Sequence, residues 1–287
     1  MGKRVQVVLW AFITILFWAS AFPFTKYVIY SVSATSLAEA RMIIGALVLL
    51  LVTSKQGLSF PRRKDWILFI GIAIAGNIGY QIVFSLGILS IPAATSSIIM
   101  ALTPLTVASM AYGIYKERLH TMGWLCIITA FIGVGIVLLW DGMLYIQMGA
   151  IWTLLGMLLF AGYTILSREL SMKGYTPLTI ATWGMVVASF MGIPWIPSMI
   201  EELAHVTMIE GGMIFFLGAL SSAVAFITWA YALELAEKTA DVTCFMFLSP
   251  VIVTGMSWAL LGEFPNRGFF IGGALIIISL FLFNKYR

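Results

Sequence analysis

The chain has 287 residues, of which 61% are hydrophobic and only 10% are charged, and its mean hydropathy is +1.04. A soluble domain carries about 45–50% apolar and about 25% charged residues. So few charges could not cover a water-facing surface. The composition therefore excludes a soluble domain, a disordered chain, a disulfide-stapled secreted fold and a nucleic-acid-binding protein. It predicts an all-α integral membrane protein that has the lipid bilayer around it.

The membrane crossings are indicated by long stretches without charge, because a transmembrane helix needs about 20 apolar residues. The stretch 66–115 is too long for one crossing, and we divide it at Ser90-Ile91-Pro92 because proline disfavours a continuing helix. Glu39 and Arg41 interrupt the start of the second crossing. Ten transmembrane helices are predicted, at 5–25, 37–54, two within 66–115, 119–140, 142–167, 174–200, 211–233, 242–262 and 268–284.

The basic residues of the loops predict the orientation, since Lys and Arg accumulate on the cytoplasmic side. With the N-terminus inside, only Lys26, Arg41 and Arg267 of the sixteen basic residues fall on the outer side. An even number of crossings returns the C-terminus to the same side. We expect a multi-pass protein with both termini in the cytoplasm, so the net charge of +4 faces the inner leaflet and needs no nucleic-acid partner.

An internal repeat is visible at an offset of about 146 positions. Pro104 then coincides with Pro250, and Glu117 coincides with Glu263, in a chain where both residue types are scarce. Each half contains five predicted crossings, and because five is odd the second half enters the membrane from the opposite side. The sequence thus predicts two inverted five-helix repeats. Their predicted bounds are residues 1–142 and 143–287.

Several short motifs occur in a particular order along nearly the whole chain. They are Phe-Trp-Ala-Ser-Ala-Phe-Pro-Phe-Thr-Lys at 17–26, Ala-Arg at 40–41, Ala-Ala-Thr-Ser-Ser to Thr-Pro at 93–104, Lys-Glu-Arg-Leu at 116–119, Leu-Ser-Pro at 248–250 and Gly-Glu at 262–263. Together with the ten helices, these motifs are similar to those of the drug/metabolite transporter superfamily, EamA type. The resemblance implies a bacterial inner-membrane carrier or exporter of small metabolites, often amino acids, with a central cavity between the halves. The first helix lacks the acidic residue of the related small multidrug pumps, which argues against proton antiport of their kind.

Inverted repeats also favour transport on physical grounds, because two similar halves of opposite orientation can expose a site between them to each side in turn. The alternative is a duplication that only produces a stable bundle. The predicted function is a secondary transporter, an exporter by resemblance, that works by alternating access on a small-molecule substrate. The rivals are an intramembrane enzyme such as a lipid-linked transferase, for which no cluster of catalytic residues is visible, and a channel, for which polar residues are too sparse.

Two prolines lie near the centres of equivalent predicted helices. Pro104 and Pro250 each remove a backbone donor and leave the carbonyl four residues earlier, on Met100 and Met246, in need of another partner. Such breaks are tolerated where the backbone meets protein or a wet cavity. These four residues are candidates for a helix kink beside the substrate path, and ordinary bending for packing is the alternative.

One face of the third predicted helix carries, at helical spacing, Asn77, Tyr80, Gln81 and Phe84. Amides in hydrocarbon need hydrogen bonds, so they either bind a substrate or tie helices together. An apolar wall with few polar groups suits small organic ligands. Further candidate substrate-binding residues are Trp18, Tyr163, Trp183 and Trp229.

Ionisable residues inside crossings are functional candidates by default. Arg41 is expected to bind either an anionic group of the substrate or an internal partner. We expect Lys26 to reach the outer headgroups from the end of the first helix, and Glu117 and Glu263 each to bond the start of the next helix.

Neither the cysteines nor the histidines have the spacing of a metal site or a catalytic triad. Cys126 and Cys244 lie in separate apolar runs, and His120 and His205 lie in loops on opposite sides. The sequence therefore predicts no metal site, no catalytic triad and no cofactor, and it leaves the oligomeric state open between a monomer and an assembly.

Overall fold

The computed structural model describes residues 3–57, 59–116, 120–140, 148–236, 242 and 244–286, and all the regular structure in those residues is helical. The first repeat contains α1 (Lys3–Val28), α2 (Ala34–Gln56), η1 (Arg63–Asp65), α3 (Trp66–Ile72), η2 (Ala73–Asn77), α4 (Ile78–Ser90), α5 (Ala93–Met100), α6 (Thr103–Tyr115) and α7 (Thr121–Leu139). The second contains α8 (Met148–Met172), α9 (Pro177–Met191), η3 (Ile193–Trp195), α10 (Ile196–Leu203), α11 (Met208–Phe215), η4 (Phe216–Val224), α12 (Ala225–Leu235), η5 (Cys244–Leu248), α14 (Ser249–Leu261) and α15 (Arg267–Tyr286).

The lengths of these helices bear on the predicted ten crossings. In the described part of the chain, seven helical segments are long and apolar enough to cross a membrane, and the bent pair of α9 and α10 makes an eighth. The last two predicted crossings correspond to shorter apolar helices, Ser249–Leu261 and Arg267–Phe283. The all-α membrane fold is confirmed, and helix length by itself supports eight of the ten crossings.

Polar residues in the preceding turns cap the N-termini of several helices. The hydroxyl of Ser33 accepts a hydrogen bond from the backbone N–H of Ser36 at the start of α2, and Thr176 caps α9 in the same way. Thr207 and Glu210 form a reciprocal capping box at the start of α11. These caps satisfy N–H groups that a helix leaves without partners.

One predicted crossing is not a single straight helix. Residues 174–200 were expected to form one crossing, but the segment ends its first helix at Met191 and bends by 52° before it continues. Gly192 lies at the bend, and Pro194, which has no N–H to donate, follows it. The bent pair still counts as one crossing. The bend itself was not predicted, because the absence of charge was considered and the prolines were not.

The two repeats share two local irregularities. The third crossing of each repeat contains a π-helical segment, η2 in the first and η4 in the second. The fourth crossing of each repeat is interrupted just before a proline, between α5 and α6 and between η5 and α14. π-Helical turns are rare and frequently occur at functional sites. Their equivalent positions agree with a repeated five-helix unit.

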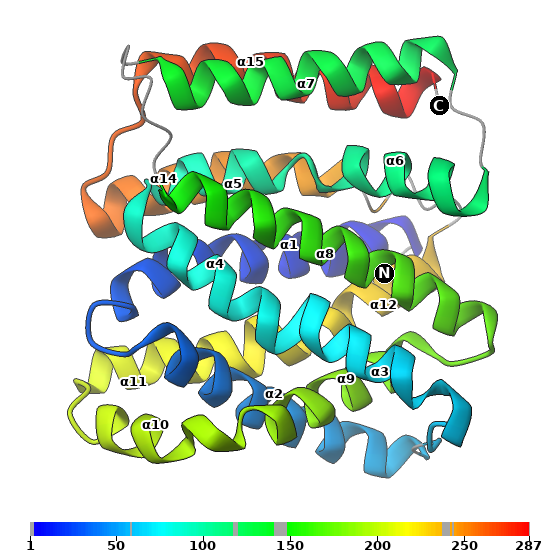
Figure 1. Cartoon of the computed structure of the whole chain (residues 1–287), viewed down its shortest axis with the longest axis vertical. Coiled ribbons are helices and arrows are strands. Elements are labelled where there is room, and N and C mark those ends of the chain that lie inside the picture. Colours follow the sequence, from blue (N-terminus) through cyan, green and yellow to red (C-terminus); the bar gives the residue numbers. More distant parts are fainter. Residues whose placement is uncertain are drawn as a thin grey trace.

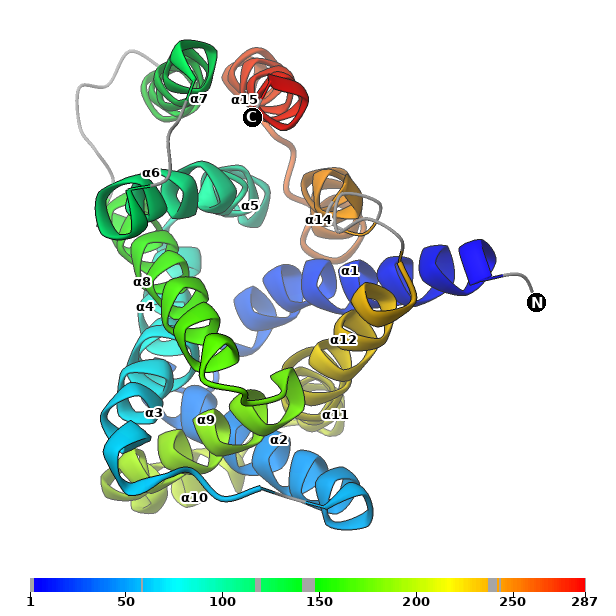
Figure 2. The same ribbon diagram turned by 90° about the vertical axis from the view of Figure 1, so that its right-hand side faces the viewer.

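The ribbon views show how the helices are layered. α7 and α15 lie side by side at one edge of the bundle, and α2, α3, α9 and α10 lie at the opposite edge (Figure 2). Both labelled chain ends are in the right-hand half of Figure 1. The first repeat begins on that side with α1, whereas α8 begins the second repeat on the opposite side, so the two repeats run in opposite directions (Figure 1).

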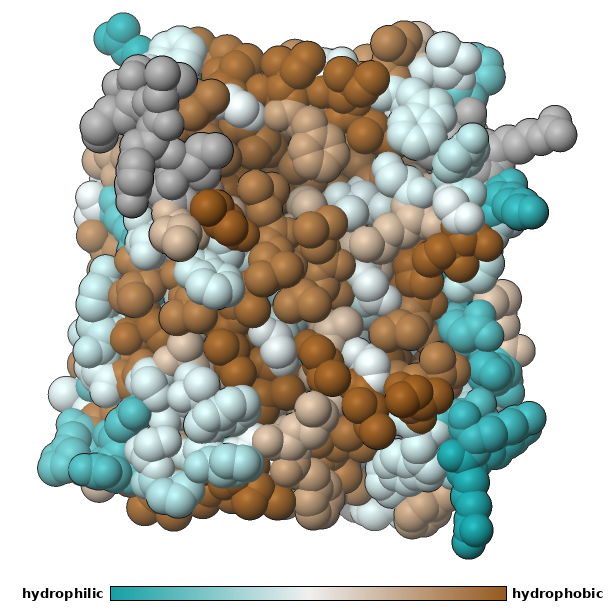
Figure 3. Space-filling model, viewed as in Figure 1, coloured by the Kyte–Doolittle hydropathy of each residue, from teal (hydrophilic) through white to brown (hydrophobic). Residues whose placement is uncertain are grey.

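The surface view agrees with a bilayer around the bundle. Hydrophobic residues cover the middle of the visible face, and hydrophilic residues gather toward its left and right margins (Figure 3). The exposed apolar side chains include Leu47, Ile67 and Phe281. In a water-soluble protein such a continuous apolar face would be costly. Here the polar margins coincide with the helix ends in the matching ribbon view.

Glycines bring α7 and α15 into close contact. A Cβ atom on Gly133 would lie 2.8 Å from the carbonyl oxygen of Gly272, and one on Gly272 would lie 2.4 Å from the carbonyl oxygen of Gly133. Small residues let transmembrane helices approach closely in this way. The packing of this pair therefore depends on the absence of side chains at both positions.

We expect Gly133→Val to lower the stability of the protein by about 1–3 kcal/mol, the usual cost of overpacking. The matched control is Gly135→Val in the same helix, because nothing lies within 4 Å of a Cβ atom at that position. Both substitutions change helix propensity equally, so the difference between them isolates the contact. Thermal unfolding of the purified variants in the same detergent measures it. Equal unfolding temperatures for the two variants would contradict the packing argument.

Candidate functional site

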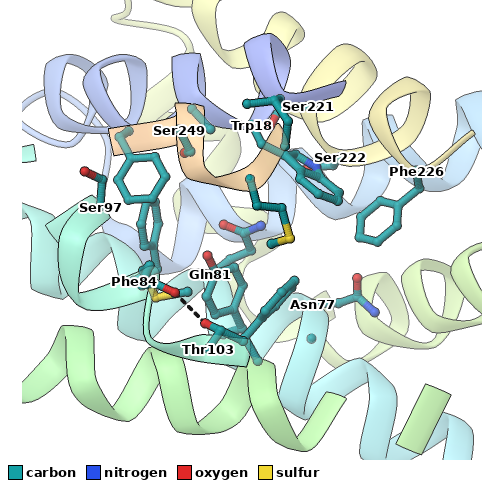
Figure 4. Close-up of a pocket in the computed structure, with 18 of the residues that line it drawn as sticks. Trp18, Asn77, Gln81, Phe84, Ser97, Thr103, Ser221, Ser222, Phe226 and Ser249 are labelled. Carbon is teal, nitrogen blue, oxygen red and sulfur yellow. Dashed lines mark hydrogen bonds between the residues drawn. The ribbon is translucent and has the colours of Figure 1, made fainter. Parts of the chain in front are cut away.

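A cavity of about 140 Å³ lies inside the bundle. Its walls come from α1, α2, η2 with α4, α5 with α6, α8, α9, η4 with α12, and η5 with α14, and no residue of α7 or α15 lines it. Figure 4 shows aromatic and polar side chains from several of these helices around the same space. Both repeats thus contribute to one central cavity.

Arg41 of α2 lies on the cavity wall and is almost fully buried, with an exposed fraction of 3%. Its Nε and Nη2 atoms donate to the hydroxyl of Ser222, at 3.3 and 3.1 Å, and its Nη1 atom lies 3.5 Å from the hydroxyl of Thr25. Ser222 belongs to the π-helical segment η4 of the second repeat. The guanidinium is therefore positioned by neutral hydroxyl groups from both repeats.

No described carboxylate forms an ion pair with Arg41. The residues that line the cavity include neither Asp nor Glu. In the described part of the chain, no group of three or more His, Cys, Asp and Glu residues is arranged as metal ligands would be. Among the described residues, the cavity wall therefore carries one buried cation without a carboxylate to neutralise it.

The predicted helix breaks are found at the cavity. Pro104 and Pro250, together with Met100 and Met246, all line it. The prolines do not kink a continuous helix; each lies in the first turn of a new one, α6 or α14. Thr103 donates from its hydroxyl to the carbonyl oxygen of Met100 at 2.6 Å (Figure 4), which satisfies the backbone group at the first break.

The polar face of the third crossing is also found on the wall, where Asn77, Tyr80 and Gln81 line the cavity. Asn77 donates from its side-chain amide to the backbone oxygen of Ile72 at 3.3 Å, within its own crossing. The side-chain oxygen of Gln81 is buried and has no hydrogen-bond partner. Asn77 is thus held locally, whereas Gln81 presents a free acceptor.

Of the predicted tryptophan and tyrosine candidates, some line the cavity and others pack behind its wall. Trp18 lines the cavity, and its ring lies 5.7 Å from that of Phe226 between centroids. Tyr163 and Trp229 do not line it, although they pack against the lining rings of Phe226 and Trp18 respectively.

Trp183 was predicted to bind the substrate, but it does not line the cavity and is a packing residue. Its indole N–H donates to the backbone oxygen of Ser59 at 3.0 Å, and its ring packs against Trp66. The sequence could not distinguish it from Trp18, since both lie in apolar crossings.

Other lining residues were not among the predicted substrate-binding candidates. Phe22 and Phe84 meet edge to face with ring centroids 5.0 Å apart, and Phe160 lies 5.2 Å from Tyr80. Ser221 lines the cavity, and its hydroxyl is buried without a hydrogen-bond partner. Of these residues, Phe84 lies on the predicted face of the third crossing, where helical spacing had placed it beside Gln81. The others carry no such signal.

Lys26 does not reach the membrane surface as expected. Its Nζ atom lies 2.6 Å from Oε1 of Glu263 and donates to the backbone oxygen of Ile91 at 2.7 Å. The other oxygen of Glu263 accepts from the backbone N–H of Ala93 at 3.0 Å. An ion pair and an unpaired helix N-terminus are stronger attractions for these groups than the headgroups.

The carboxylate of Glu263 therefore binds the start of a helix, as predicted, but that helix is α5 of the other repeat and not the next one. It joins α1, the turn before α5 and the segment after α14. Glu117, the predicted counterpart, lies outside the described residues.

A second contact between the repeats is at the beginning of the third crossing. The hydroxyl of Tyr175 donates to Asp65 at 2.9 Å, and Nζ of Lys173 lies 3.4 Å from the same carboxylate. Asp65 belongs to the first repeat, and its two partners follow α8 in the second. The cavity is thus flanked by polar contacts between the repeats at both ends of the bundle.

Comparison with known proteins supports the fold and the class of function. The model of the EamA-like transporter family matches residues 5–139 and again residues 147–285. A protein of Streptantibioticus cattleyicolor named "Probable terminal-alkyne amino-acid exporter" is 26% identical over 98% of this chain and 95% of its own length. The uncharacterized transporter YdfC of Bacillus subtilis is 24% identical over 96% of this chain and 90% of its own.

A solved crystal structure has the same fold, with a TM-score of 0.63 at 18% identity over 97% of this chain and 96% of that one. The family model covers nearly the whole sequence as two adjacent copies, and the named relatives are transporters and not enzymes. The chain belongs to the EamA-like transporter family.

Proposed function

We propose that this transporter exports amino acids, or metabolites that resemble them, and binds them in the central cavity. The observation that carries the proposal is Arg41, a buried guanidinium on the cavity wall without a described carboxylate partner. An unpaired cation in a low-dielectric interior is costly unless an anion joins it. A substrate carboxylate is such an anion, and guanidinium groups bind carboxylates in a bidentate manner.

The broken fourth crossings support the same assignment. Thr103 and Pro104 begin α6 at the cavity, and Ser249 and Pro250 begin α14 there. The N-terminus of a helix carries partial positive charge, and discontinuous helices in transporters point such ends at anionic substrate groups. Two helix N-termini therefore add to the positive potential around Arg41.

The rest of the wall suits the other parts of an amino acid. Gln81 and Ser221 line the cavity, and the side-chain oxygen of each is buried without a hydrogen-bond partner. After a change of rotamer toward the cavity, each can accept a hydrogen bond from an ammonium group. Trp18, Phe84 and Phe226 provide apolar and aromatic surface for the substrate side chain. This combination favours a zwitterion with an apolar side chain. The substrate named for the Streptantibioticus cattleyicolor relative, an amino acid with a terminal alkyne, has that chemistry.

The proposed mechanism is alternating access in the bacterial inner membrane, with both termini in the cytoplasm. Inverted repeats give two conformations of similar energy that open to opposite sides. The orientation rests on the thirteen basic residues that the ten-crossing topology assigns to the inner side. Outward direction rests on the export function of the named relative.

The test is counterflow by the purified protein in proteoliposomes. Vesicles loaded with an excess of one unlabelled amino acid are expected to accumulate the same labelled amino acid transiently, with a rate that saturates. A set of apolar, cationic and anionic amino acids identifies the preferred class, and a decarboxylated amine of the best substrate is the matched control. Uptake of the amine as fast as that of the amino acid would contradict a carboxylate site at Arg41, and a rate that never saturates would indicate a channel.

A further inference from the structure

Glu39 is a carboxyl group that the transport site does not use. It lies in α2, two residues before Arg41, and its exposed fraction is 0%. Both of its carboxyl oxygens are buried and neither has a hydrogen-bond partner. It is not among the residues that line the cavity. An ionised carboxylate in such a place would have neither water nor a described cation in contact with it.

The carboxyl group of Glu39 fits beside Gly192 of the other repeat because glycine has no side chain. A Cβ atom on Gly192 would lie 1.5 Å from Oε2 of Glu39, and the same Cβ atom would lie 2.8 Å from Cδ1 of Ile78. Gly192 is the residue at which the seventh crossing bends between α9 and η3. The carboxyl group therefore fills a space that only glycine leaves, at a contact between the two repeats.

The charged groups around α2 are engaged elsewhere. The elements packed against α2 are α4, α9, η3, α10, α11 and η4. Glu202 of α10 accepts from the backbone N–H of Ser33, and Glu210 of α11 binds Ser31 and the cap of its own helix. The remaining titratable groups on these elements are an exposed carboxylate of α10 and a tyrosine of α4 on the cavity wall, and no such group is present on α9, η3 or η4. These groups are Glu201 and Tyr80.

We propose that Glu39 is a proton-binding site, and that the proton it holds determines how strongly Arg41 attracts the carboxylate of the substrate. With the proton in place Glu39 is neutral, and Arg41 is a cation without a counter-charge. Loss of the proton to water, once α2 and the bend at Gly192 separate enough for water to enter, leaves a negative charge two residues from the guanidinium. Residues two apart on a helix do not face each other, so the two charges lie on different sides of α2. Opposite charges on the order of 10 Å apart still attract each other in a protein interior, where water screens them little. Proton release therefore weakens substrate binding, and proton binding strengthens it.

The proton-binding half of this proposal can be tested without any substrate. The probe is the infrared C=O stretch of protonated carboxyl groups, recorded for the full chain in lipid nanodiscs from about pH 5 to about pH 10, a range that includes the behaviour documented for buried glutamates. We expect the wild type to show a protonated carboxyl band at neutral pH that Glu39→Gln removes. Glu263→Gln, a change in a carboxylate that is paired with Lys26, is the matched control and is expected to leave the band in place. Identical spectra for the wild type and Glu39→Gln at every pH would overturn the proposal.

A second variant guards against misfolding of the first. Gly192→Ala places a methyl group where Oε2 of Glu39 lies, so it must move the carboxyl group. The protonated band is expected to shift or disappear in this variant although the glutamate is still present. An unshifted band would show that the observed proton is held elsewhere.

The coupling half rests on the proposed function and uses the amino acid found by counterflow. The affinity of the wild type for this amino acid is expected to fall at least about fivefold as the pH rises through the range in which the infrared band disappears. Fivefold is the low end of the usual coupling between two sites. Glu39→Gln, which is permanently neutral, is expected to keep the high affinity at every pH. The same pH dependence in both proteins would overturn the coupling and leave the proton site intact. Should no amino acid be transported, the proposed function fails, and the infrared result still decides the proton site.

Discussion

Replacing Arg41 with alanine is expected to lower the transport of amino acids by about 100-fold. Truncating one partner of a buried charge pair costs about 2–5 kcal/mol, and each 1.4 kcal/mol is a factor of ten. The stability of the protein is expected to stay the same or rise, because the substitution removes a buried cation that has no described counter-ion. Counterflow rates and thermal unfolding of the same preparations measure the two effects.

Two variants separate the charge of Arg41 from its geometry. Arg41→Lys keeps the charge but loses the planar fork, so an intermediate loss is expected. Ser222→Ala removes the hydroxyl that accepts from Nε and Nη2 and leaves the charge in place, so it should cost less than Arg41→Ala. A variant Arg41→Ala that transports normally, or one that loses stability in proportion to transport, would show that the guanidinium is structural.

The second large effect is expected on stability, when the ion pair of Lys26 and Glu263 is broken. Lys26→Met is expected to lower stability by about 3 kcal/mol, at the low end of the range for breaking a buried ion pair, because the two side chains keep exposed fractions of 10% and 20%. The substitution leaves Glu263 partly buried without its cation, and it removes the hydrogen bond to the carbonyl oxygen of Ile91. Thermal or denaturant unfolding in detergent measures the loss.

The double variant Lys26→Met with Glu263→Gln completes a cycle. The glutamine can still accept from the backbone N–H of Ala93, and no unpaired charge is left. We expect the double variant to be more stable than Lys26→Met alone. Additive effects of the two substitutions would mean that the residues do not interact, whatever their separation in the structure.

The crossings and the repeat could be predicted from the sequence because lipid imposes length and apolarity on each segment separately. The irregular backbone at Pro104 and Pro250 followed from proline chemistry, and its symmetry followed from the repeat. The sequence predicted kinks within helices, whereas each proline lies in the first turn of a new helix. The position of the two prolines at the cavity could not be derived, because it depends on how eight crossings pack around a common space.

Contacts between distant segments were the part that sequence reasoning missed. Lys26 and Glu263 are 237 positions apart, and neither side chain indicates its partner. The same holds for Glu39 and Gly192, where the informative feature is a side chain that is absent. Trp183 was misjudged for a related reason: an indole in an apolar helix is compatible with a binding site or with packing, and only its bond to Ser59 decides.

The pair of α7 and α15 has a practical consequence. These two helices pack on each other through Gly133 and Gly272, yet they supply none of the cavity wall. Reporter groups for spectroscopy can therefore be attached to their outward faces, for example at the exposed Ile132 or Ile278, without touching the ligand. For the same reason, we expect substitutions among related proteins on the outward faces of α7 and α15 to leave substrate choice unchanged. The two glycines in the contact are expected to be retained.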